Sequence, residues 1–142
     1  MIKQFFNPGI HPNNTSYLLL ILRLAVGIFM LTHGIGKSYK LFGDDPIQFA
    51  DPLGVGATAS LALTVFSEVL CSILLILGLL SRAAAIPLII TMLVAAFIVH
   101  GNDGIGKQEL PILYAVMYLV IAIMGAGKIS LDKWIYSKIN QA

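Results

Sequence analysis

The chain has 142 residues, of which 58% are hydrophobic and only 11% are charged, whereas about 25% of residues are charged in a typical soluble domain. The mean hydropathy of +0.88 is far too high for a soluble protein of this size. A net charge of +2 supplies no basic face for nucleic acid, and the single cysteine, Cys71, cannot form an intrachain disulfide. These figures exclude a disordered chain, a disulfide scaffold and a nucleic-acid module, and they indicate an integral membrane protein.

Four apolar runs organise the chain. They cover approximately residues 17–37, 59–80, 83–100 and 110–127. Each run has the length of about 20 residues that a helix rising about 1.5 Å per residue needs to cross the hydrocarbon layer. Open strands would leave unpaired backbone groups in lipid, so helices are expected. The predicted fold is therefore an all-α membrane protein in which residues 17–127 form a bundle of four transmembrane helices.

The basic residues that flank the runs predict the orientation. The side that carries both termini and the second loop has five of them, Lys3, Arg82, Lys128, Lys133 and Lys138. The opposite side has three, Lys37, Lys40 and Lys107. Because basic flanks favour the cytoplasm, the N-terminal tail 1–16 and the C-terminal segment 128–142 are both predicted to be cytoplasmic.

Two segments outside the runs have features of their own. The first loop, residues 38–58, is rich in proline and glycine and contains Phe49, so it is expected either to fold as a cap on the outer face or to be a plain solvated connector. Ser130 can cap a short helix that runs through Ile139. Its apolar side and Trp134 predict a helix that lies in the cytoplasmic interface.

Ionisable residues interrupt the apolar runs, and at membrane depth each of them requires a partner. The first run carries one stripe made of Arg23, Gly27, Met30, Gly34 and Lys37; the second carries another made of Thr64, Glu68, Cys71 and Gly78. Arg23 is expected roughly 9 Å and Glu68 roughly 18 Å above the cytoplasmic boundary. We therefore expect either an Arg23–Glu68 ion pair or an Arg23 side chain that extends to the inner headgroups, which would leave Glu68 protonated or paired elsewhere.

A second polar group is expected near the outer boundary, roughly 24 Å up. It consists of His33, Lys37, His100 and Glu109, with Glu68 a turn or two below. In one interpretation His33, Glu68 and His100 exchange protons as catalytic groups, because histidine titrates near neutrality. The residues expected to bind a cofactor are Arg23, His33, Lys37, His100 and Glu109. In the other interpretation all these groups only stabilise the bundle and solvate the helix ends.

Three ligands suit such a group of side chains. Histidine and carboxylate side chains inside a bundle can hold a quinone headgroup and exchange its protons. A metal is a weaker interpretation, because no Glu-x-x-His or His-x-x-x-His spacing occurs. A haem between His33 and His100 is the third, although His100 is expected close to the surface. The sequence contains no Gly-rich phosphate loop and no Cys pair.

Several short motifs resemble the DoxX family. They are Leu22-Arg23-Leu24 with Gly27, His33-Gly34-Ile35-Gly36-Lys37, Glu68 ahead of Leu77-Gly78-Leu79, Ser81-Arg82, His100-Gly101 and the segment from Gly125 to Asp132. The resemblance implies a small four-helix protein of the bacterial inner membrane. Some members of that family serve as subunits of thiosulfate:quinone oxidoreductases. Matched by position, the polar set of the family is Arg23, His33, Lys37, Glu68 and His100.

Two classes of function follow. The first is the membrane subunit of a quinone-linked oxidoreductase; it requires a partner subunit, because the chain carries no motif for a redox cofactor. The second is a non-catalytic assembly factor, anchor or small carrier, and a haem or metal protein is a minor alternative. In each case the chain contacts the lipid bilayer, and a homo-oligomer is compatible with the sequence.

Overall fold

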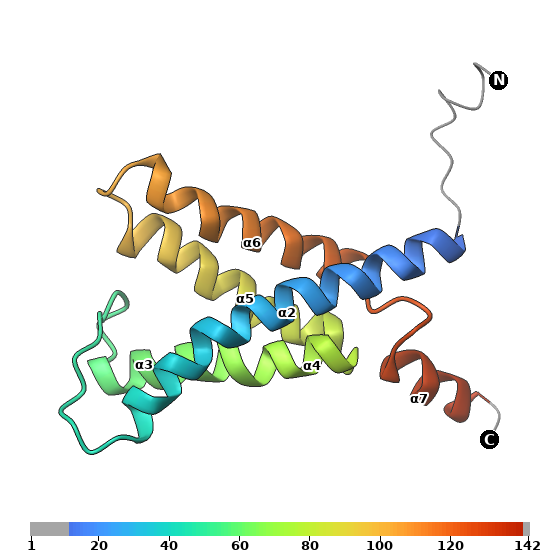
Figure 1. Ribbon diagram of the computed structural model, residues 1–142, viewed down its shortest axis with the longest axis horizontal. Coiled ribbons are helices and arrows are strands. Elements are labelled where there is room, and N and C mark those ends of the chain that lie inside the picture. The colour runs from blue at the N-terminus through green and yellow to red at the C-terminus, as the bar shows by residue number, and fades with distance from the viewer. Residues whose placement is uncertain (1–11, 141–142) are drawn as a thin grey trace.

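The computed structural model describes residues 12–140, and all regular structure in that range is helical (Figure 1). The elements, in chain order, are α2 (Pro12–Phe42), α3 (Ala57–Val65), the π-helix η1 (Phe66–Cys71), α4 (Ser72–Leu77), α5 (Ser81–Val94), the π-helix η2 (Ala95–Val99), α6 (Ile105–Met124) and α7 (Leu131–Ile139). The elements α3, η1 and α4 follow one another without a break, and so do α5 and η2. Residues 12–140 therefore form four long helical segments and the short helix α7.

Within residues 12–140, four helical segments are long and apolar enough to cross a membrane. They are Asn14–Phe42, Ala57–Leu77, Ser81–Val99 and Ile105–Met124, and we call them the first to fourth spans. This confirms the predicted all-α fold with four membrane-spanning helices. Helix α2 extends beyond the predicted run 17–37 at both ends, so the first loop is shorter than expected and covers residues 43–56. Residues 1–11 of the predicted tail lie outside the described part of the chain.

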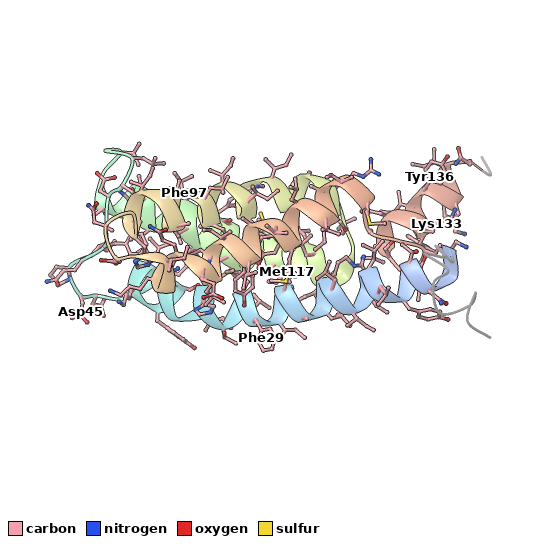
Figure 2. All side chains as sticks on the ribbon, turned by 90° about the horizontal axis from the view of Figure 1, so that it is seen from above. Phe29, Asp45, Phe97, Met117, Lys133 and Tyr136 are labelled. Atoms are coloured by element: carbon pink, nitrogen blue, oxygen red, sulfur yellow. The ribbon has the colours of Figure 1, made fainter. Side chains whose placement is uncertain are left out.

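The core of the bundle is apolar and lies where all four spans meet. Helices α5 and α6 lie side by side, and α2 crosses the bundle diagonally towards α3 (Figure 1). Met30, Leu75 and Tyr118 are buried between the spans. Phe29 and Phe97 point away from the bundle on opposite sides (Figure 2), and they are 60% and 61% exposed. Such an apolar exterior is expected where lipid replaces water.

Two glycines allow α2 to approach the second span closely, as the stripe on the first run predicts. A Cβ atom added to Gly27 would lie 2.6 Å from Ile76 Cγ1. A Cβ atom added to Gly34 would lie 2.7 Å from Val69 Cγ2 and 2.9 Å from the backbone carbonyl carbon of Glu68. Small residues at such crossings permit close backbone packing. The contact at Gly34 fixes the register of α2 against η1.

The short helix α7 lies at the end of the bundle where α2 begins (Figure 1). Its predicted cap is confirmed, because Ser130 Oγ accepts a hydrogen bond from Lys133 N at 3.2 Å. The Asp132 carboxylate accepts hydrogen bonds from Leu80 N at 2.7 Å and Ser81 N at 3.0 Å, where α5 begins. These bonds tie α7 to the tight turn between α4 and α5.

Candidate functional site

A cavity of about 540 Å³ lies at the loop end of the bundle, within the range of about 300–1,000 Å³ that is typical of ligand sites. Residues of the second and third spans, of the end of α2 and of the 43–56 loop line this cavity. Most of the lining is apolar; its polar or ionisable members are Lys37, Ser60, Thr64, Ser67, Glu68, Thr91 and His100. We call it the loop-end cavity.

An ion pair between Lys37 and Glu68 forms the charged part of the wall. Lys37 Nζ lies 2.5 Å from Glu68 Oε1 and 2.7 Å from Glu68 Oε2. The Glu68 side chain is only 3% exposed, whereas the Lys37 side chain is 30% exposed. An ammonium group has three N–H donors, and the carboxylate accepts two of them. The third has no partner among the described residues and is free for a ligand oxygen in the cavity.

The expected Arg23–Glu68 ion pair is wrong, because Glu68 pairs with Lys37 instead. Arg23 is 1% exposed and lies in the first half of α2, away from Lys37, where its Nη2 donates to the Ile129 carbonyl at 2.8 Å. The close contact of Gly34 with η1 explains the difference. Lys37 follows Gly34 by one turn and therefore reaches Glu68, whereas Arg23 precedes Gly34 by three turns. Arg23 contacts the segment before α7 and does not line the loop-end cavity.

Both π-helices border the loop-end cavity. η1 contributes Phe66, Ser67 and Glu68 to its wall, and η2 contributes Ala95 and Val99. Single π-turns inside α-helices occur frequently at functional sites, because they re-aim side chains at the cost of regular hydrogen bonding. Ser67 Oγ is buried and makes no hydrogen bond to any residue that the structure describes. A buried hydroxyl without a partner is costly, so Ser67 offers the cavity a polar atom that a ligand can satisfy.

His100 follows η2 and lines the loop-end cavity from the third span. Its Nδ1 lies 2.8 Å from Asp103 Oδ2, and Lys107 Nζ lies 3.4 Å from the same oxygen. The pKa of Asp103 lies below its ordinary value, chiefly because of the hydrogen bond with His100. The hydrogen bond and the charge of Lys107 lower it further. With Nδ1 engaged by the carboxylate, Nε2 is the ring nitrogen of His100 that remains available to another group.

The 43–56 loop forms part of the cavity wall. This observation distinguishes the two expectations for the first loop, a cap or a plain connector. Phe49, Pro52 and Leu53 contribute to the cavity lining, so the loop is a cap rather than a plain connector. Asp51 fastens this cap to the start of the second span. Its Oδ1 accepts hydrogen bonds from Val55 N at 3.0 Å and Ser60 Oγ at 2.7 Å.

The Asp51 carboxylate also shapes the turn before α3. Asp51 Oδ2 accepts a hydrogen bond from Gly56 N at 2.8 Å. The pKa of Asp51 lies below its ordinary value, chiefly because of the hydrogen bond from Ser60. Hydrogen bonds from backbone amides, of which that of Gly56 has the largest effect, also lower it. The carboxylate is therefore ionised at neutral pH, and its hydrogen bonds hold the cap in place.

The sequence-predicted site residues fall into three groups. Lys37, Glu68 and His100 meet at the loop-end cavity. His33 and Glu109 are exposed and do not line it, and Arg23 lies near α7. Among residues 12–140, no three His, Cys, Asp or Glu side chains gather as a metal-binding group would require.

Three residues at or near the loop-end cavity were not predicted from the sequence: Ser67, Asp103 and Asp51. Ser67 directly precedes Glu68, and Asp103 follows His100 at a spacing that lets the two side chains meet in the turn. The signal for these two residues is therefore local, a polar side chain close in sequence to a predicted site residue. The role of Asp51 depends on the folded loop, and no local pattern in the sequence indicated it.

Comparison with known proteins gives one family. The model of the DoxX family matches residues 18–101. An uncharacterised protein of Haemophilus influenzae is 33% identical over 86% of this chain and 93% of its own length. The inner membrane protein YphA of Escherichia coli is 32% identical over 82% of this chain and 89% of its own length. An uncharacterised membrane protein of Mycobacterium tuberculosis is 29% identical over 81% of this chain and 79% of its own length. No solved structure matches the chain significantly.

Proposed function

Because the chain belongs to the DoxX family of membrane proteins, we propose that it is the membrane subunit of a quinone-linked oxidoreductase complex. In this proposal the loop-end cavity binds the quinone, and a partner subunit supplies the electrons. The complex resides in the bacterial inner membrane, and the cavity lies in the outer half of the bilayer. The description of one relative as an inner membrane protein supports this location.

The observation that carries the proposal is the polarity of the loop-end cavity. Its lining is mostly apolar, and one wall holds the Lys37–Glu68 pair beside the unpartnered Ser67 hydroxyl. A quinone has the matching chemistry, because an apolar ring carries two carbonyl oxygens that accept hydrogen bonds. Ligand pockets typically combine apolar walls with a few placed polar groups of this kind.

The side chains have distinct roles in this proposal. The third N–H of Lys37 and the Ser67 hydroxyl donate to a quinone oxygen. Reduction of a quinone to a quinol takes up two electrons, which the partner provides, and two protons. His100, whose Nδ1 lies against the Asp103 carboxylate, transfers protons between the cavity and the aqueous face through its Nε2.

Binding of a quinone to the purified protein tests the proposal directly. The protein is reconstituted in lipid nanodiscs that contain a tailed benzoquinone or a tailed naphthoquinone, and the bound quinone is extracted after washing and quantified. We expect stoichiometric retention of at least one of the two by the unmodified protein. Retention of neither would overturn the proposal.

Two lysines of α2 provide a matched pair of variants. Lys37→Met removes a charged donor from the cavity, and an interaction of this kind is typically worth about 1.5–3 kcal/mol. The affinity should therefore fall about tenfold or more. Lys40→Met removes the same charge from an exposed position that does not line the cavity, so it should leave binding unchanged. Equal effects of both changes would argue against a site at Lys37.

Arg23 supports a second candidate function, that of a non-catalytic anchor or assembly factor. Its buried guanidinium contacts the segment before α7 rather than the loop-end cavity, so at least this polar group has a structural contact. If the Lys37–Glu68 pair has the same purpose, the protein binds no quinone. The nanodisc experiment separates the two functions.

A further inference from the structure

We propose that the loop-end cavity takes its ligand sideways from the bilayer, between the second and third spans, so that the substrate is a membrane-dissolved quinone with a long hydrocarbon tail. This inference rests on the proposed function and names its substrate class. It predicts that the headgroup lies at Lys37 and Glu68 while the tail leaves the protein between α3 and the α5–η2 segment. A water-soluble quinone would not need such a path.

The outer wall of the cavity is also the lipid-facing surface of the protein. Leu63, Phe66 and Ile90 line the cavity and are nevertheless 56%, 49% and 54% exposed. All three belong to the second and third spans, where exposed side chains face lipid. Apolar side chains that contact both the cavity and the lipid leave no polar barrier between the two. A hydrocarbon chain can therefore extend from the cavity into the bilayer without contact with water.

The arrangement of the spans provides space for such a path. Near the tight turn before Ser81, α4 packs against α5, and the two spans are close. Towards the loop end, α3 packs against α2 and separates from the third span (Figure 1). The cavity fills the space between the diverging spans, with Leu63 on one side and Ile90 on the other.

The 43–56 loop forms part of the wall of the cavity on its aqueous side. Phe49, Pro52 and Leu53 of the 43–56 loop line the cavity, and Asp51 fastens that loop to Ser60 of α3. A ligand that comes from water would have to pass this loop. A ligand that comes from the bilayer would meet mostly apolar side chains, with Thr64 and Thr91 as polar residues of the second and third spans in the lining.

The polarity of the cavity orients the ligand. Lys37 and Glu68 lie where α2 meets η1, on the inner side of the cavity, and Ser67 is buried beside them. The exposed apolar residues lie on the opposite, lipid-facing side. A molecule with a polar ring at one end and a hydrocarbon tail at the other matches both sides at once.

The experiment compares two probes that share one headgroup. One is 2,3-dimethoxy-5-methyl-1,4-benzoquinone without a tail, and the other is the same ring with a decyl chain. Binding of each is measured to the full-length protein in nanodiscs. Leu63→Trp and Ile90→Trp place a bulky side chain on the proposed tail path. Leu70→Trp and Ile86→Trp make the same change at exposed positions of the same two spans that do not line the cavity.

We expect Leu63→Trp and Ile90→Trp to weaken binding of the decyl probe by about tenfold or more and to leave binding of the tailless probe unchanged. The two control variants should bind both probes as the unmodified protein does. Circular dichroism and gel filtration establish that each variant is folded. Unchanged binding of the decyl probe in both path variants, or equal losses for the two probes, would overturn lateral access while the proposed function stands. If neither probe binds the unmodified protein and the tailed naphthoquinone is not retained either, the proposed function itself fails.

Discussion

Three charged side chains inside the bundle have different environments, and their partners indicate their roles. Arg23 donates to the Ile129 carbonyl at the α7 end. Lys37 and Glu68 pair at the opposite end, beside the loop-end cavity. A charge at membrane depth is expensive unless it is paired or hydrated. The bundle therefore keeps one charged group for a structural contact and one ion pair where a ligand can reach it.

The Lys37–Glu68 pair should show strong coupling between its two members. Removing one partner of a buried ion pair leaves an uncompensated charge and typically costs about 3–5 kcal/mol. We expect Lys37→Met and Glu68→Gln each to lower the unfolding temperature in detergent clearly, and the double variant to lower it by less than the sum. Additive losses in the double-variant cycle would show that the two side chains do not interact.

The stabilisation of the folded 43–56 loop by Asp51 should depend on pH. Its pKa is depressed below the ordinary 3.8, chiefly by the hydrogen bond from Ser60 and then by those from the backbone, led by Gly56. A depressed pKa means that the carboxylate stabilises the folded loop at any pH above 3.8 and that this contribution is lost as the pH falls through the folded-state value. Hydrogen exchange of the loop amides, corrected for intrinsic rates, should therefore stay slow down to about pH 5 and rise below pH 4.

The matched variant for this measurement is Asp51→Asn. Its amide cannot ionise, so exchange in the loop should be faster at neutral pH and should show no step between pH 5 and pH 3. A step of the same size in Asp51→Asn would assign the pH dependence to another group. Asp44 and Asp45, in the same loop, are the carboxylates to examine in that case.

At the scale of the helices, two features position the site: the glycine contact of α2 and the π-turn of η1. Gly34 lies against the backbone of Glu68, so α2 and η1 are in direct contact there. The π-turn then places Ser67 and Glu68 next to each other on the cavity wall. Because Lys37 follows Gly34 by one turn, the same contact that sets the helix crossing also forms the ion pair.

Gly34 and Gly36 provide a sharp test of that contact. Gly34→Ala would place a Cβ 2.9 Å from the backbone carbon of Glu68, which cannot move without shifting η1. We expect a loss of stability of about 1–3 kcal/mol, as is typical of overpacking, together with weaker quinone binding. Gly36→Ala adds a Cβ that meets nothing within 4 Å, so it should leave stability unchanged or raise it by about 0.5–1 kcal/mol. Equal unfolding temperatures for the two variants would contradict the role of Gly34.

The sequence predicts the helices well because the length of an apolar run encodes a membrane span directly. It also predicts the cap of α7, because Ser130 acts through a hydrogen bond to a residue three positions away. It does not predict the partner of Glu68, because estimates of depth along straight helices ignore the crossing at Gly34. The π-turns and the position of the 43–56 loop depend on packing between distant segments, which no local pattern in the sequence reports.

For the molecule as a whole, the structure places the beginning of α2 and the helix α7 at one end and the 43–56 loop at the other. Figure 2 shows Asp45 at the opposite end from Lys133 and Tyr136. The Arg23–Ile129 hydrogen bond joins the first span to the segment before α7. The two ends of the described chain therefore lie at one end of the bundle (Figure 1), and four spans predict that this end faces a single side of the membrane. The excess of flanking basic residues, five against three, predicts that this side is the cytoplasm.

Cysteine labelling tests this orientation, because the native Cys71 is buried in the bundle and gives little background. Asp45→Cys introduces a thiol at an exposed position of the cap loop, and Lys138→Cys introduces one at an exposed position of α7. In intact cells, a membrane-impermeant maleimide should label Asp45→Cys and should label Lys138→Cys only after permeabilisation. A fluorescent reporter fused after Ala142 should be active, as in the cytoplasm. The reverse labelling pattern would place the loop-end cavity, with Lys37, Glu68 and His100, on the cytoplasmic side, and proton exchange with the quinone would then take place there.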